Sequence, residues 1–298
     1  MSPGVSRFVS AQDGLRLHAR DYGPLTSSLL PVVCLPGLSR TVEDFDILAT
    51  ALSDGSRTAA RRVVALDYRG RGLSDWDPDP RNYDLRVESS DITTVLTALG
   101  IARAIFVGTS RGGLHVMMLG ALRPAFLAGA VLNDIGPVIA AEGLSRIKGY
   151  IGKLPQPKSW DEAVLALKQI AGGHFTGLDA QAWEAYARLT FQEKDGVIGA
   201  RYDPGLMENL KLLDLDDIPE LWPQFEGLQH IPLQIIRGAN SDLLSATTAD
   251  EMVRRHPNCD LVVVPGQGHA PLLMDDPTID NIVAFVTRCD ARELAGLN

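Results

Sequence analysis

The chain has 298 residues, of which 45% are hydrophobic and 22% are charged, as in ordinary soluble globular proteins. Its length suits one α/β domain with a large insertion, or two domains. The net charge of −9 at pH 7 gives no general attraction for nucleic acid or for an anionic membrane, so neither is an expected partner.

The cysteines and the N-terminal segment indicate the compartment. Cys34, Cys259 and Cys289 are scattered and form neither a CxxC pair nor a metal-like spacing with histidine, so we expect reduced thiols and no metal site. The first residues lack the charged-then-apolar pattern of a secretion signal, and no apolar run reaches membrane-spanning length. We therefore expect a cytoplasmic protein.

The first half of the chain alternates strand and helix patterns. Residues 7–23 predict a β-hairpin that turns at Asp13-Gly14. After it, residues 31–37 and 62–67 predict buried strands, and residues 41–55 and 90–101 predict helices. A strand at 104–107, a helix around 114–119 and a strand at 128–137 complete this half. The alternation predicts a mostly parallel sheet with helices on both faces.

The same pattern returns after residue 230. Strands are predicted at 232–238 and 259–266, and helices at 246–257 and 278–289. Between the two halves, residues 138–229 show helical patterns, including 159–172 and 179–194, and no clear strand. We therefore expect a core domain made of residues 1–137 and 230–298, interrupted by a helical insertion of residues 138–229.

The segment Gly108-Thr-Ser110-Arg-Gly112 joins a short apolar strand to a helical pattern. It matches G-x-S-x-G, the strand-to-helix turn that exposes a nucleophilic serine. The glycines permit a sharp turn, and the N-terminus of the following helix favours a developing negative charge. Because a glycine-rich turn with an ordinary serine could share this pattern, the assignment of Ser110 depends on finding its partners.

A serine nucleophile needs a base, and the chain has six histidines. His269 is the best candidate because "LVVVPGQGHAP" places it in a glycine-rich loop just after an apolar strand. Loops at the carboxyl ends of parallel strands are where such sheets carry their chemistry.

Two aspartates could orient that histidine. The chain order serine, acid, histidine favours Asp242, in the polar turn "GANSD" after the strand that precedes the histidine's own strand. Asp134, just after the strand that follows the serine, is the alternative acid. In the first arrangement, Arg111 could pair with Asp134 or could bind a substrate carboxylate.

Two backbone amides are expected to form an oxyanion hole for the developing charge. One belongs to Arg111, directly after the serine, and the other to Leu38, in the loop after the first parallel strand.

These motifs together resemble the α/β-hydrolase superfamily over nearly all of the chain. The matching residues are Pro36-Gly37-Leu38, "DYRGRGLSD" (67–75), Gly108–Gly112, Asp242 and "GQGHAP" (266–271). The resemblance implies the α/β-hydrolase fold, and the insertion matches the helical cap of that family. The greatest similarity is to small bacterial carboxylesterases and enol-lactone hydrolases. Serine at the nucleophile position argues against haloalkane dehalogenases and epoxide hydrolases, which use aspartate there.

We therefore predict a serine hydrolase that cleaves a small-molecule carboxylic ester or lactone through an acyl-enzyme on Ser110, without a cofactor. Carbon–carbon bond or amide hydrolysis and acyl transfer could use the same three residues, although Ala270 stands where carbon–carbon hydrolases often carry tryptophan. A ligand receptor on the same fold is the alternative from another class. The sequence leaves the oligomeric state open.

Three aromatic residues of the insertion are candidates for lining the substrate pocket. They are Trp160, Trp183 and Tyr186, although aromatic residues on amphipathic helices commonly form a core.

Overall fold

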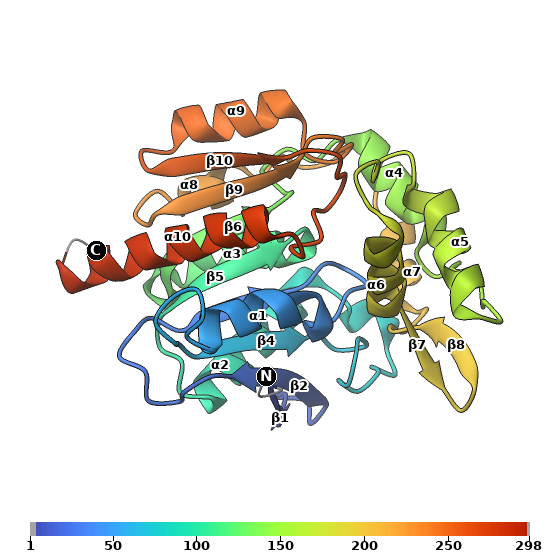
Figure 1. Cartoon of the computed structure of the whole chain (residues 1–298), viewed down its shortest axis with the longest axis horizontal. Coiled ribbons are helices and arrows are strands. Elements are labelled where there is room, and N and C mark those ends of the chain that lie inside the picture. Colours follow the sequence, from blue (N-terminus) through green and yellow to red (C-terminus); the bar gives the residue numbers. More distant parts are fainter. Residues whose placement is uncertain (1–3, 297–298) are drawn as a thin grey trace.

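The computed structural model describes residues 4–296, and an eight-stranded sheet lies at its centre (Figure 1). The strand order is β1-β2-β4-β3-β5-β6-β9-β10. β2 is antiparallel to β1 and β4, and all the other neighbouring strands are parallel, as expected. The strands are β1 (Val5–Ser10), β2 (Arg16–Tyr22), β3 (Val32–Leu35), β4 (Val63–Asp67), β5 (Ala104–Thr109), β6 (Leu127–Asn133), β9 (Leu233–Gly238) and β10 (Cys259–Val264).

Helices cover both faces of the sheet because its central strands are apolar on both sides. On β3, Val32 and Cys34 pack into one hydrophobic cluster, and Val33 and Leu35 into the other. Helices α1 (Asp46–Ser53) and α10 (Asp276–Leu294) contribute to the first cluster. Helices α2 (Leu85–Ala98), α3 (Arg111–Leu122), α8 (Trp222–Glu226) and α9 (Ala246–Arg255) contribute to the second. Short 3-10 helices occur at Val42–Phe45, Pro80–Asn82 and Pro124–Phe126.

Most of the insertion lies beyond the ends toward which the parallel strands point (Figure 1). It contains α4 (Ala141–Tyr150), α5 (Trp160–Ala171), α6 (Ala180–Thr190), the strands β7 (Phe191–Lys194) and β8 (Val197–Ala200), and α7 (Leu206–Lys211). Helices α5 and α6 and the two strands share a small core of their own that includes Leu167, Trp183 and Phe191. Helix α8, by contrast, packs on α3 beside the sheet, although it belongs to the range predicted as insertion.

The expectation that residues 138–229 hold no strand is wrong. The helix predicted over 179–194 ends at Thr190, and Phe191–Lys194 pairs with Val197–Ala200 as an antiparallel hairpin. Asp195 and Gly196 join the strands, both with positive φ, which is the conformation that Asp-Gly favours in two-residue hairpin turns. This Asp-Gly pair was the sequence signal for the hairpin.

A search of the helices within residues 4–296 found none with both the length and the apolar character that a membrane crossing requires.

Candidate active site

The turn between β5 and α3 places Ser110 at the carboxyl edge of the sheet. Ser110 has φ 51° and ψ −113°, a conformation that non-glycine residues rarely adopt. Its amide donates to the carbonyl of Asn133 on β6 at 2.9 Å. A Cβ at Gly112 would lie only 2.0 Å from the carbonyl oxygen of Leu35, so only glycine lets α3 begin this close to β3. The serine therefore stands at the tip of a turn that neighbouring strands hold in place.

His269 reaches Ser110 from the loop after β10. Its Nε2 lies 2.8 Å from Oγ of Ser110, and its side chain is only 6% exposed. The side-chain amide of Asn133 donates to the carbonyl of Pro271 at 2.9 Å, which anchors the histidine loop to the end of β6. The structure thus brings the predicted nucleophile and base within hydrogen-bond distance.

Asp134 is the carboxylate that contacts this histidine. Its Oδ2 lies 2.8 Å from Nδ1 of His269, and its side chain is fully buried. The same carboxylate accepts hydrogen bonds from the amide of Gly238 at 2.7 Å and from Oγ of Ser241 at 2.5 Å. These three contacts hold the buried carboxylate in a fixed position against the imidazole.

The prediction that Asp242 orients His269 is therefore wrong. Its carboxylate accepts hydrogen bonds from Nε and Nη2 of Arg146, on α4, at 2.6 and 2.8 Å, and it lies 3.8 Å from Nε2 of His174. Burial opposes the ionisation of Asp242, but the Arg146 guanidinium outweighs it and lowers the pKa of this carboxyl. The turn after β9 points Asp242 at the insertion, whereas Asp134 follows directly on β6, which lies next to the strand of the nucleophile.

The structure contradicts one of the two alternatives for Arg111, its pairing with Asp134. Nε of Arg111 donates to Oε2 of Glu88 at 2.6 Å, and Nη2 donates to the carbonyl of Tyr83 at 3.0 Å. Asp134 instead accepts from the amide of Gly238 and from Oγ of Ser241, and contacts Nδ1 of His269. The guanidinium is thereby turned toward α2 and away from the base.

The two residues proposed for an oxyanion hole both lie at Ser110. Arg111 is the first residue of α3, so its amide has no acceptor within the helix. No group in the described part of the chain accepts a hydrogen bond from the amide of Leu38. Both residues border the space in front of Ser110.

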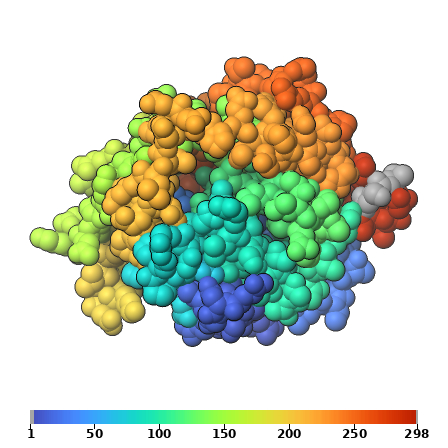
Figure 2. Space-filling model, turned by 180° about the vertical axis from the view of Figure 1, so that it is seen from behind, coloured from blue at the N-terminus to red at the C-terminus, as the bar shows by residue number. Residues whose placement is uncertain are grey.

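Two cavities meet at Ser110, and Leu38 and Ile147 border both. The smaller one, of about 80 Å³, also includes His269 and has a mixed lining, with the polar residues Arg40, Asp44, Tyr150 and Tyr186 beside apolar ones such as Phe45 and Leu273. Because its four polar side chains distinguish it from the other cavity, we call it the polar cavity. The larger one, of about 440 Å³, is mostly apolar, with lining residues such as Leu114, Ile139, Leu144, Leu210 and Leu243. The molecule is hollowed on the face where the orange part of the insertion borders the teal and green core (Figure 2).

Of the three aromatic residues predicted to line the pocket, only Tyr186 borders these cavities. Trp183 is 5% exposed and packs in the separate core of the insertion, stacked behind Tyr186 with ring centroids 6.0 Å apart. Trp160 packs beside that core, with its indole N–H donating to Glu193 at 3.3 Å. The expectation for both tryptophans is wrong, because Trp183 is buried in the insertion's own core and the partly buried Trp160 packs at the edge of that core.

Comparison with known proteins agrees with this geometry. Residues 32–280 match the model of the alpha/beta hydrolase family. The chain belongs to this family. The sheet and its covering helices accordingly form an α/β-hydrolase fold.

Relatives of this α/β hydrolase extend over nearly its whole length. It is 34% identical over 289 residues to a 3-hydroxybutyrate-oligomer hydrolase of Cupriavidus necator, covering 94% of this chain and 97% of the relative. It is 27% identical to a 2-(acetamidomethylene)succinate hydrolase of Mesorhizobium japonicum, covering 86% and 84%. The crystal structure of an alpha/beta hydrolase from Novosphingobium aromaticivorans superposes with a TM-score of 0.89 and 39% identity, covering 97% of this chain and 99% of that one. The chain is a hydrolase.

Within residues 4–296 no group of three or more His, Cys, Asp or Glu side chains could hold a metal ion. Sequence reasoning did not find Tyr150, Arg40 or Asp44 as lining residues, or Glu88 as the partner of Arg111. For Asp134 the signal was present, since an aspartate directly after a buried strand lies at the sheet edge where the serine emerges.

The two aspartates should respond differently to loss of charge. Asp134→Asn should lower kcat by about 10⁴-fold, because the amide would no longer stabilise the protonated histidine or hold its tautomer. Steady-state kinetics on an activated ester measures this effect, with circular dichroism to check folding. Full activity in a folded Asp134→Asn variant would contradict the assignment.

Asp242→Asn should instead lower the free energy of unfolding by about 1–2 kcal/mol, between the values for exposed and buried ion pairs. Since the folded-state pKa of Asp242 is lowered, the pair stabilises the fold above the unfolded pKa, near ~4. This stabilisation is lost as pH falls through the folded pKa. Urea unfolding at pH 7 and at lower pH should therefore show the difference between variant and wild type shrinking with acidification; a constant difference would exclude the ion pair as its cause.

Proposed function

We propose that the chain hydrolyses a carboxylic ester or lactone through an acyl-enzyme on Ser110. The observation that carries this proposal is the unbroken hydrogen-bonded chain from Ser110 Oγ through His269 to Asp134, with both links at 2.8 Å. Nucleophile, base and orienting acid in this order form the arrangement that activates serine hydroxyls in hydrolases.

In the first half of the reaction, Oγ of Ser110 attacks the acyl carbon while Nε2 of His269 takes its proton. Asp134 stabilises the imidazolium that forms. The amides of Leu38 and Arg111 donate to the oxyanion. The imidazolium then gives its proton to the leaving alcohol oxygen, and the carbon–oxygen bond of the ester breaks.

In the second half, water attacks the acyl carbon with His269 as base, and the collapse of the second oxyanion releases the acid and restores Ser110. All of the proton transfers use one histidine, so the leaving group and the attacking water must both approach from its side.

This requirement orients the substrate. His269 borders the small polar cavity, whereas the apolar cavity extends from Ser110 along α3 and the insertion. We therefore place the leaving alcohol in the polar cavity and the alkyl part of the acyl group in the apolar one.

The polar cavity offers hydrogen-bond donors, but the charged side chains around it already form ion pairs with one another. Asp44 accepts from Nε and Nη2 of Arg40 at 2.7 and 2.8 Å, and Asp242 similarly occupies Arg146 near the two tyrosines. Burial raises the pKa of Tyr150 to about 12 and also raises that of Tyr186, so both phenols keep their protons. Among the described residues no group hydrogen-bonds either phenol. Such a cavity suits a neutral oxygen acceptor better than an anion.

The substrate class proposed on this basis is an ester of a short hydroxy acid, whose leaving group carries a second, neutral ester group. The name of the relative from Cupriavidus necator, a 3-hydroxybutyrate-oligomer hydrolase, supports this choice. In an oligomer of that kind, the carbonyl of the next unit would supply the acceptor for the tyrosines.

We also propose that the insertion, residues 138–229, acts as the cap. Ile147, Tyr150 and Tyr186 border the cavities from α4 and α6, and the ion pair of Arg146 with Asp242 ties α4 to the loop after β9. The cap thus selects the substrate, while the core residues supply the chemistry.

Ser110→Ala should lower kcat/KM for ester hydrolysis by at least about 10³-fold while the fold is kept. The same variant should escape labelling by a fluorophosphonate, and in wild type the label should map to the peptide that contains Ser110. If the purified variant hydrolyses activated esters at the wild-type rate, both the nucleophile and the proposed function are wrong. Binding without turnover in wild type would favour the receptor.

The double variant Tyr150→Phe/Tyr186→Phe should lower kcat/KM about 10-fold on the methyl ester of the 3-hydroxybutyrate dimer, because a neutral hydrogen bond contributes roughly 0.5–1 kcal/mol and two are lost. Hydrolysis of ethyl butyrate, whose leaving group has no second oxygen acceptor, should change less than about 2-fold. Tyr202→Phe is the matched control, since its phenol bonds the amide of Gly152 outside both cavities. Equal losses of kcat/KM on both esters would show that the two tyrosines do not contribute to substrate selection.

A further inference from the structure

A buried ion cluster lies directly beneath the two residues that present the oxyanion-hole amides. Its centre is Glu88 on α2, which is fully buried. Oε1 of Glu88 accepts from Nη1 of Arg71 at 2.7 Å, and Oε2 accepts from Nε of Arg111 at 2.6 Å. Nε2 of His115 lies 3.1 Å from the same Oε2. One carboxylate thus joins two guanidiniums from different parts of the chain.

Each arginine of the cluster connects to one of the two amides. Arg111 carries one amide itself, and its side chain is clamped between Glu88 and the carbonyl of Tyr83. Arg71 donates from Nε to the carbonyl oxygen of Leu38 at 2.8 Å, so it anchors the residue that carries the other amide. The loop of Leu38 and the start of α3 come from separate strands, and the path through Arg71, Glu88 and Arg111 joins them by side chains.

The cluster also has an uncompensated charge. Burial by itself would raise the pKa of Glu88, but the two guanidiniums outweigh it and hold this pKa well below its ordinary value. Burial lowers the pKa of His115, so its imidazole is neutral. Two cations and one anion therefore remain, and Nη2 of Arg71 is buried without a hydrogen-bond partner. Burying this many charges is costly, so the cluster is a poor device for stability alone.

We propose that Glu88 is a positioning residue that sets the oxyanion hole, by fixing Leu38 through Arg71 and the first residue of α3 through Arg111. This inference rests on the proposed function. Because oxyanion donors act only if they are already aimed at the transition state, a loosened amide would weaken the transition state more than it weakens substrate binding.

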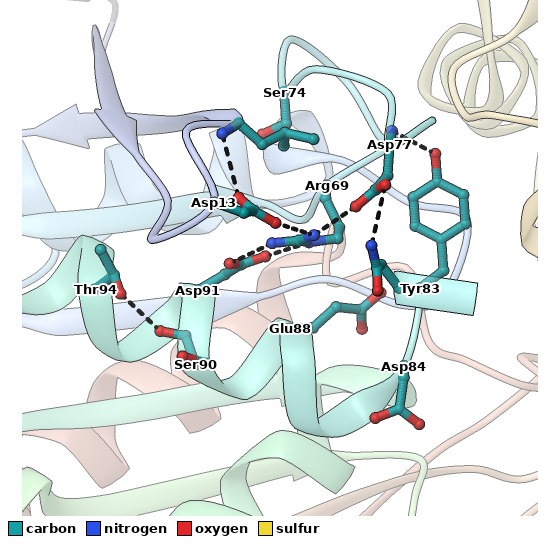
Figure 3. A network of polar contacts seen from close by, with 12 residues as sticks. Asp13, Arg69, Ser74, Asp77, Tyr83, Asp84, Glu88, Ser90, Asp91 and Thr94 are labelled. Atoms are coloured by element: carbon teal, nitrogen blue, oxygen red, sulfur yellow. Dashed lines mark hydrogen bonds and ion pairs between the residues drawn. The ribbon is translucent and has the colours of Figure 1, made fainter. Parts of the chain in front are cut away.

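The neighbouring cluster around Arg69 supplies a matched control (Figure 3). Asp91 lies one turn after Glu88 on α2 and accepts from Nε and Nη2 of Arg69 at 2.7 and 2.8 Å. Asp77 and Asp13 accept from Nη1 of the same arginine. Asp91 is buried like Glu88, but among the hydrogen bonds and ion pairs within residues 4–296 its carboxylate contacts neither Leu38 nor Arg111.

The experiment compares Glu88→Gln, Arg71→Met and Asp91→Asn on one ester, and measures kcat, KM, melting temperature and the Ki of a trifluoromethyl ketone that forms a tetrahedral adduct with serine. Glu88→Gln and Arg71→Met should each lower kcat about 10- to 100-fold, less than or comparable to the loss of one whole oxyanion donor, with KM within about 3-fold of wild type. The Ki of the ketone should rise by the same factor as kcat/KM falls. Asp91→Asn should lower the melting temperature but leave kcat within about 2-fold.

Glu88→Gln also separates positioning from charge. It makes the cluster more positive, so a purely electrostatic role predicts unchanged or better oxyanion binding, whereas positioning predicts a loss. If Glu88→Gln does not fold, Arg71→Met carries the test, because it keeps the pair of Glu88 with Arg111 and removes the anchor of Leu38, together with the hydrogen bond from Arg71 to the carbonyl of Arg69.

Wild-type kcat and ketone affinity in folded Glu88→Gln or Arg71→Met would overturn the inference, as would a rise in KM alone or equal kinetic losses in Asp91→Asn. Ser110→Ala distinguishes a failure of the positioning role of Glu88 from a failure of the proposed function. If that variant is inactive and Glu88→Gln is fully active, only the positioning role fails; if Ser110→Ala is active, the proposed function itself fails.

Discussion

A fully buried carboxylate needs hydrogen-bond donors, and this requirement at Asp134 organises the edge of the sheet. The donors come from the end of β9, from the turn that follows it and from the loop after β10. Two separate segments, the end of β9 with its turn and the loop after β10, are thereby drawn to the end of β6. The imidazole of His269 is one of those donors, so satisfying the buried charge also aims Nε2 at Ser110. The same imidazole of His269 therefore satisfies the buried carboxylate and contacts Oγ of Ser110.

In the turn after β9, a second aspartate makes a different kind of contact from that of Asp134. Asp242 lies only one residue beyond Ser241, which bonds Asp134, yet its carboxylate faces α4 and binds Arg146. One aspartate is enclosed by the core and the other joins the core to the insertion. In the proposed function, the turn after β9 therefore joins the residues that carry the chemistry to the insertion that would select the substrate.

The two cavities at Ser110 would receive different parts of the substrate in the proposed reaction. The polar one is formed where Tyr150 and Tyr186 of the insertion meet the loop that carries Arg40 and the separate loop that carries His269. The apolar one runs between α3 and the helices α4 and α7. Because Ser110 lies where they meet, an ester bond placed across it has its two sides in different environments. Beneath this point, the ion cluster of Glu88 links the loop of Leu38 to the start of α3.

Local patterns in the sequence determined the fold class of this protein and the position of its sharp strand-to-helix turn. Alternating apolar strands and amphipathic helices specify a mostly parallel, doubly covered sheet, because each periodicity dictates which faces must be buried. The glycines around Ser110 identify the sharp turn, since only a residue without Cβ permits α3 to approach β3 so closely.

Tertiary structure decided which side chains meet. Chain order favoured Asp242, but strand order placed Asp134 beside the serine, because β6 is the spatial neighbour of β5 and β9 lies one strand further away. The partner of Arg111, the burial of Trp183 and the separate core of the insertion likewise depend on contacts between distant segments. Periodicity along a chain reports which face of an element is buried, but it carries no information about which other element covers that face, and ion pairs and sites are made by that choice of neighbour.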